Sequence, residues 1–138
     1  MVGNIAARLS GRVFVSSAHH VCVVDDDQSV RLALASLLRS LGYEVATFES
    51  AHALLAWIGA NRAACVISDL QMPGMSGMQL FARLREMGVP APLLLITAYP
   101  TAELAERAQA IGVRAFLTKP VNANDLAAHV EAALLAAR

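Results

Sequence analysis

From His20 to the end of the chain, short apolar runs alternate with segments that carry apolar residues at helical spacing. An apolar run of four to eight residues bounded by turn signals is typical of a buried strand. Strands that alternate with helices indicate a parallel sheet covered by helices on both faces. We therefore predict an α/β, doubly wound fold of five strand–helix units. The predicted strands are Val21–Val24, Glu44–Phe48, the run from Cys65 to Asp69, Pro92–Ile96 and Ala115–Thr118.

The predicted helices are marked by capping residues and apolar stripes. Asp27 and Ser50 stand at N-cap positions, Ser76 forms a capping box with Gln79 three residues later, and Gly42 ends the first helix. The stripes are Val30, Leu34, Leu37, Leu38 and Leu41; Leu54, Leu55 and Ile58; Leu80 and Leu84; Leu104, Ala108 and Ile111; and Leu126, Val130, Ala133 and Leu134.

The composition limits the classes of function. The 138 residues suit one domain, and eleven basic against eleven acidic residues give no net charge that would attract nucleic acid or an acidic membrane. No stretch approaches the roughly 20 apolar residues that span a bilayer. Cys22 and Cys65 lie in predicted strands without zinc-site spacing, so we expect free thiols in a cytoplasmic protein.

The first 19 residues sustain neither helical nor strand periodicity, and they lack the features of a secretory signal. We predict a flexible extension over residues 1–19 and a folded domain over residues 20–138. The adjacent His19 and His20 suggest a metal site, but an exposed pair beside a strand is more typical of residues without a function.

Polar side chains follow four of the predicted strands. Asp25 and Asp26 end the first strand, Asp69 the third, Thr97 the fourth and Lys119 the fifth. The carboxyl ends of parallel strands meet at one edge of a sheet, which is where ligands bind in such folds. We therefore expect these side chains to form one site.

Three carboxylates at one edge repel each other unless a cation lies among them. Mg²⁺ accepts one or two carboxylates, a carbonyl and several waters, and it commonly shares its shell with a phosphate. The Thr97 hydroxyl and the Lys119 ammonium suit the other oxygens of a phosphoryl group on Asp69. On the local pattern alone, Asp69 is equally well explained as a residue that caps the turn. Asp27 is expected to cap a helix and to take no part in the chemistry.

Four motifs, in this order and spacing, resemble those of the receiver domain of bacterial two-component response regulators: VCVVDDDQSVR, SDLQMPGMSG, LLLITA and FLTKP. The stretch SVRLALASLLRSLGYEVATFESA resembles the nitrogen-fixation regulator subtype. The resemblance covers about residues 20–138. It implies a flavodoxin-like sheet of strand order 2-1-3-4-5 with five helices.

The resemblance also implies a phosphoacceptor and a metal site. Asp69 would accept the phosphoryl group from a sensor histidine kinase or a phosphotransfer protein. Asp26, Asp69 and the backbone carbonyl of Gln71 would bind Mg²⁺ directly, Asp25 would reach the ion through water, and Mn²⁺ would substitute. The protein would then be a signalling phosphoacceptor that catalyses only its own phosphotransfer and dephosphorylation.

Further residues acquire expected roles from the resemblance. Thr97, Ala98 and Lys119 would contact the phosphoryl oxygens, and the bond before Pro120 would be cis. Phe116 would turn inward on activation, together with Thr97, and change the face made by the fourth helix, fifth strand and fifth helix. That face is a candidate for homodimer formation.

The resemblance implies that Gln71, two residues after Asp69, and Tyr99, two residues after Thr97, would flank the path of a hydrolytic water. Gln71 cannot take a proton as a carboxylate would, and Tyr99 is large enough to cover the phosphoryl group, so we expect a long phosphoryl lifetime. The alternative is that Tyr99 points outward. Relatives of this subtype usually continue into a helix-turn-helix domain, whereas this sequence stops at Arg138, which suggests a single-domain regulator or one part of a longer protein.

Three other functions have some of the same sequence features. An aspartyl-nucleophile phosphatase needs a second acid two residues after the nucleophile, where Gln71 stands. A flavin or nucleotide carrier needs a phosphate-binding loop after the first strand, where the aspartates would repel phosphate. A receiver-like scaffold that is never phosphorylated stays open as an alternative.

Overall fold

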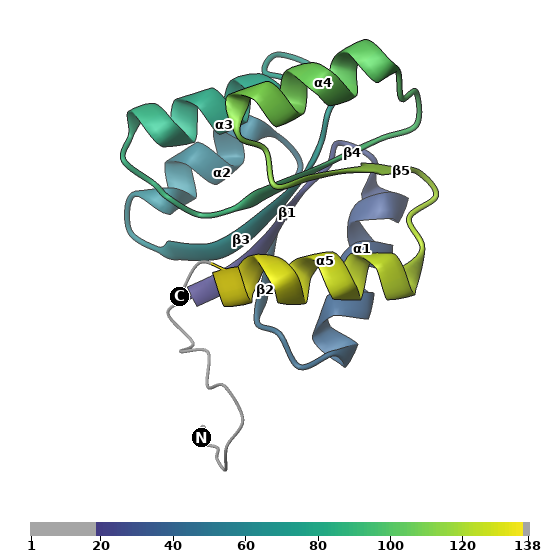
Figure 1. Ribbon diagram of the computed structural model, residues 1–138. Coiled ribbons are helices and arrows are strands. Elements are labelled where there is room, and N and C mark those ends of the chain that lie inside the picture. Colours follow the sequence, from purple (N-terminus) through teal and green to yellow (C-terminus); the bar gives the residue numbers. More distant parts are fainter. Residues whose placement is uncertain (1–18, 137–138) are drawn as a thin grey trace.

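The computed structural model describes residues 19–136, which form a parallel sheet of order β2-β1-β3-β4-β5 between two layers of helices (Figure 1). This order and the five helices confirm the predicted fold. The strands are β1 (His19–Val24), β2 (Val45–Phe48), β3 (Arg62–Asp69), β4 (Leu93–Thr97) and β5 (Ala115–Thr118). The helices are α1 (Gln28–Ser40), α2 (Ala51–Ile58), α3 (Gly77–Glu86), α4 (Ala102–Ile111) and α5 (Ala123–Ala136).

Two strands begin earlier than their apolar runs. β1 starts at His19 and β3 at Arg62, because His19 pairs with Arg62 and His20 with Ala63 before the register shifts at Val21. The expectation that His19 belongs to an N-terminal extension is therefore wrong, and residues 1–18 lie outside the described part of the chain. A pairing between distant segments stabilises polar residues in a strand that no local pattern predicts.

The histidine pair is also less exposed than we predicted. His20 is half-buried, and its ring packs edge-on against Trp57 with 5.3 Å between ring centroids. Trp57 in turn lies 5.3 Å from the ring of Phe48. His20 is thus a packing residue, at the opposite end of β1 from the aspartates.

The sheet divides the interior into two apolar cores, since alternate residues of a strand face opposite sides. Cys22 and Val66 face the core under α2, α3 and α4, whereas Cys65 and Ile67 face the core under α1 and α5. The cysteines are free and buried, and burial raises the pKa of each thiol to about 12. The expectation of two free thiols is confirmed. Among the described helices, none has the length and apolarity that a bilayer crossing requires.

Side-chain caps fix the loops after β1 and β3. Asp27 accepts hydrogen bonds from the backbone N–H groups of Ser29 and Val30, so its predicted capping role is confirmed. Ser76 and Gln79 form both bonds of the predicted capping box at the start of α3. These caps determine where the loop that follows each site aspartate ends and its helix begins.

Gly77 lies where α3 meets the end of β3. A Cβ atom at this position would lie 2.6 Å from the Asp69 carbonyl oxygen and 2.5 Å from Leu95 Cδ2. The Gly77 N–H also donates to the Leu70 carbonyl at 2.9 Å. Only a residue without a side chain lets the helix start this close to the strand that carries Asp69.

We predict that Gly77→Ala lowers the free energy of unfolding by about 1–3 kcal/mol, the usual cost of overpacking a well-packed site. The obstructing carbonyl is backbone and cannot rotate away as a side chain would. Gly59→Ala is the matched control, because a Cβ there meets no atom within 4 Å. Urea denaturation of the two variants measures the difference, and equal stability would contradict the close approach.

Candidate phosphoacceptor site

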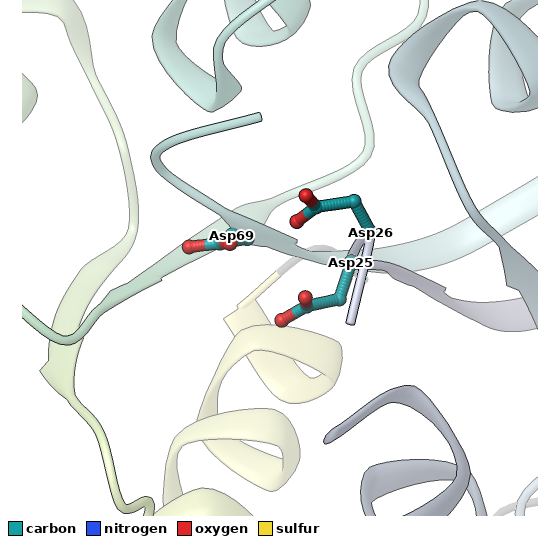
Figure 2. Close-up of side chains that lie close together, drawn as sticks. All are labelled: Asp25, Asp26 and Asp69. Atoms are coloured by element: carbon teal, nitrogen blue, oxygen red, sulfur yellow. The ribbon is translucent and has the colours of Figure 1, made fainter. Parts of the chain in front are cut away.

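Three carboxylates gather at the carboxyl ends of β1 and β3 (Figure 2). One oxygen from each of Asp25, Asp26 and Asp69 lies within 4.8 Å of the other two. Asp25 is fully buried and Asp69 is 7% exposed, whereas Asp26 is exposed. The cluster therefore has two buried carboxylates and one that is exposed to solvent.

Asp25 is held by backbone groups and by one cation. Its N–H donates to the Phe48 carbonyl at 3.1 Å, and its Oδ1 accepts the Asp27 N–H at 2.9 Å. The Lys119 Nζ lies 3.0 Å from its Oδ2. These contacts let a fully buried carboxylate keep a fixed orientation beside Asp69.

Asp69 shares the same lysine. Lys119 Nζ lies 3.4 Å from Asp69 Oδ2, and the Gln71 N–H donates to Asp69 Oδ1 at 3.4 Å. Burial, with a further contribution from the charge of Asp25, raises the pKa of Asp69 despite these two groups. One ammonium lies beside two carboxylates, so it does not fully offset the negative charge of either.

The pKa of Lys119 is raised as well, but for a lysine this shift favours the charged form. Burial favours the neutral amine, whereas the neighbouring carboxylates of Asp25 and Asp69 favour the ammonium and raise the pKa of Lys119 overall. Lys119 is therefore charged at neutral pH and remains beside the oxygens of Asp69. An ammonium in this place is suited to neutralise charge on a group attached to that carboxylate.

β4 brings a hydroxyl to the same edge of the sheet. Thr97 is fully buried, and its Oγ1 accepts the Tyr99 N–H at 3.1 Å. The Thr97 carbonyl accepts the Lys119 N–H at 2.8 Å, which ties the end of β4 to the residue that follows β5. A hydroxyl that accepts one hydrogen bond can still donate its own proton.

The oxygen donors suit a hard divalent cation. Asp25 Oδ2 is buried and, among the described residues, accepts no hydrogen bond of good geometry, although Lys119 lies beside it. Carboxylate oxygens within 4.8 Å of one another are the ligands that Mg²⁺ prefers, and the exposed side at Asp26 leaves room for water ligands.

Comparison with known proteins identifies the family. Residues 21–131 match the response regulator receiver domain. The chain belongs to the response regulator receiver family. The sequence motifs resemble those of the same family, so the resemblance to receiver domains is confirmed.

Individual relatives agree with this assignment. The receiver domain is 36% identical over 115 residues to the transcriptional regulatory protein FixJ of Bradyrhizobium diazoefficiens, covering 83% of this chain and 56% of that protein. It is 38% identical over 114 residues to the response regulator protein TmoT of Ectopseudomonas mendocina, covering 83% of this chain and 52% of that one. The receiver domain thus spans about half the length of these curated relatives.

Solved structures show the same fold. The crystal structure of FixJ-N has a TM-score of 0.77 at 32% identity, covering 84% of this chain and 93% of the other. A response regulator receiver domain protein from Clostridium thermocellum has a TM-score of 0.78 at 27% identity, covering 84% of this chain and 94% of the other.

The remaining predicted residues lie around the cluster in different environments. Phe116 is half-buried against the core under α4, and its backbone is paired with Leu95. The peptide bond between Lys119 and Pro120 is cis. Ala98 is exposed, and Tyr99 is 72% exposed, so the tyrosine ring lies largely in solvent rather than over Asp69. That is the alternative arrangement that we considered for Tyr99.

Sequence reasoning missed one contact of the cluster. Arg31, in α1, donates from Nη1 to the Asp25 carbonyl at 2.6 Å. The sequence carried one signal for this residue: Arg31 lies close to the predicted N-terminus of a helix, where the helix dipole disfavours a cation.

We predict that Asp69→Asn stabilises the metal-free receiver domain at neutral pH. The pKa of Asp69 is raised in the folded state, so the ionised carboxylate is less stable there than in the unfolded chain. The free energy of unfolding of wild type therefore falls as the pH rises from the ordinary carboxyl pKa through the folded value, and it stays lowered above that value. The gain should disappear below the ordinary pKa, where both side chains are neutral. Urea denaturation across this pH range measures it.

Asp27→Asn is the control for that experiment, because asparagine keeps the oxygen that caps α1 outside the cluster. It should show no comparable gain that depends on pH. A loss of stability in Asp69→Asn at neutral pH would contradict the claim that the charge of Asp69 is only partly offset by its neighbours.

Proposed function

We propose that Asp69 accepts a phosphoryl group from the phosphohistidine of a sensor kinase or phosphotransfer protein. One observation carries the proposal: Asp69 shares the Lys119 ammonium with the buried Asp25, at a distance of 3.4 Å from Lys119 Nζ. An Asp69 oxygen attacks phosphorus, the bond from phosphorus to the histidine nitrogen breaks, and that nitrogen keeps the electron pair. The product is an acyl phosphate on Asp69.

Each group of the site has a proposed role. Asp26, Asp69 and the Gln71 carbonyl would hold Mg²⁺, or Mn²⁺ in its place, and Asp25 would reach the ion through water. A bound ion would supply positive charge for the phosphoryl oxygens during transfer. Lys119, the Thr97 hydroxyl and the Ala98 N–H bind the phosphoryl oxygens. The exposed side of Asp26 supports an approach by a partner at the open side of the cluster.

The proposed switch connects Thr97 to Phe116. The Thr97 hydroxyl now accepts the Tyr99 N–H, and a turn toward a phosphoryl oxygen would break this bond and release the loop before α4. Phe116, only half-buried on the neighbouring strand, then turns inward, so that the face of α4, β5 and α5 changes and can bind a partner or a second copy. Unchanged chemical shifts at Phe116 and in α4 after phosphorylation would contradict this switch.

Gln71 and Tyr99 are proposed to set the phosphoryl lifetime. Because Tyr99 is 72% exposed, it covers the phosphoryl group only after the loop is released from Thr97. The decay of phosphorylated protein after removal of the donor tests this, and an unchanged decay rate in Tyr99→Ala would exclude the tyrosine.

Acetyl phosphate with Mg²⁺ should add one phosphate-sized mass to the protein, and intact mass spectrometry detects it. Asp69→Asn should abolish the gain because the amide is a poor nucleophile. Asp27→Ser is the matched control, since serine keeps the α1 cap and the variant should be phosphorylated like wild type. A mass gain that survives Asp69→Asn would place the phosphate elsewhere, and no gain in wild type would favour an unphosphorylated scaffold.

A phosphatase function is less well supported. Asp69 and Lys119 would suit an aspartyl nucleophile, but Gln71 offers no acid for the leaving group. Turnover of phosphate monoesters beyond one equivalent per protein would favour the phosphatase instead.

A further inference from the structure

Arg31 lies in the first turns of α1, and its side chain reaches back to the loop that carries the aspartates. Its Nη1 donates to the Asp25 carbonyl at 2.6 Å, and the residue is half-buried. The first turn of α1 holds no acidic residue, although acidic residues are the ones that the helix dipole favours there. A cation in this position thus opposes local preference, which is typical of residues that serve a site.

The carbonyl that Arg31 holds belongs to the peptide bond between Asp25 and Asp26. Because a peptide bond is planar, a hold on its oxygen also fixes the orientation of the Asp26 nitrogen. Asp25 has other restraints, through Phe48, Asp27 and Lys119. The Asp26 carboxylate is exposed and, within residues 19–136, takes part in no hydrogen bond or ion pair.

We infer that Arg31 is a positioning residue that orients the Asp25–Asp26 peptide, so that the Asp26 carboxylate faces Asp69 across a divalent cation. This inference rests on the proposed function, because it concerns the proposed cation site. By this inference Arg31, from α1, orients Asp26, the most exposed of the three aspartates.

The charge of Arg31 has an opposite effect on the site. A guanidinium repels Mg²⁺, so its removal would tighten binding if charge dominated. The guanidinium bonds to a carbonyl rather than to a carboxylate, at a partly solvated place where charge effects are screened. Orientation should therefore dominate, and removal of Arg31 should weaken binding.

The test is a Mn²⁺ titration of the full chain without phosphodonor, with free Mn²⁺ measured by electron paramagnetic resonance. Arg31→Met removes the donor and keeps much of the volume, and we expect about tenfold weaker binding, as for other groups that orient metal ligands. Arg31→Lys keeps a donor and should recover part of the affinity.

Arg39→Met is the matched control. Arg39 lies in the same helix and makes the same kind of bond, from Nη2 to the Val45 carbonyl at 3.3 Å, but at the other end of α1. This variant should bind Mn²⁺ like wild type. Circular dichroism and urea denaturation establish that the compared variants are folded.

A metal-free measurement separates the inference from the proposed function. The order parameter of the Asp26 amide, from ¹⁵N relaxation, should be lower in Arg31→Met than in Arg39→Met, because the bond that orients its peptide is lost. Equal order parameters, or Mn²⁺ binding in Arg31→Met as tight as or tighter than in wild type, would overturn the inference and leave the cation site intact. A wild type that binds no Mn²⁺ would overturn the proposed cation site, and the inference with it.

Discussion

The repulsion between carboxylates at one end of the sheet is the constraint on which the rest of the site depends. Asp25, Asp26 and Asp69 place oxygens within 4.8 Å, and the first is fully buried. Such a cluster is stable only if fixed donors and cations offset the burial of charge. The structure supplies Lys119 for two of the carboxylates and backbone N–H groups for their other oxygens. The remaining charge leaves the cluster able to attract a cation.

The strand order makes this cluster possible. β1 and β3 are neighbours at the centre of the sheet, with β4 and β5 beyond, so Asp25, Asp69, Thr97 and Lys119 end four strands that lie side by side (Figure 1). Gly77 allows α3 to begin against the Asp69 carbonyl, where a side chain would collide. The rigidity of the sheet and the close start of the helix hold the Asp69 carboxylate in place, whereas Asp26 depends on its loop.

What the sequence could predict was set by local chemistry. Asp27, Ser76 and Gln79 bond to backbone groups within three residues, so their caps follow from spacing alone. The gathering of the site residues also follows, because a parallel sheet brings the ends of its strands together. The start of β1 at His19 did not follow, since it depends on pairing with Arg62. The bond from Arg31 to Asp25 and the outward position of Tyr99 likewise depend on how a loop folds in space.

The dependence of stability on Mg²⁺ tests the central claim most directly. If the carboxylate cluster is a cation site, the free energy of unfolding of wild type should rise with Mg²⁺, by about 1.4 kcal/mol for each tenfold increase above the dissociation constant. Asp26→Ala should start from equal or higher stability without metal, because one repelling charge is gone, and should gain much less from Mg²⁺. An equal gain in the two proteins, or none in wild type, would contradict the claim that these carboxylates form the cation site.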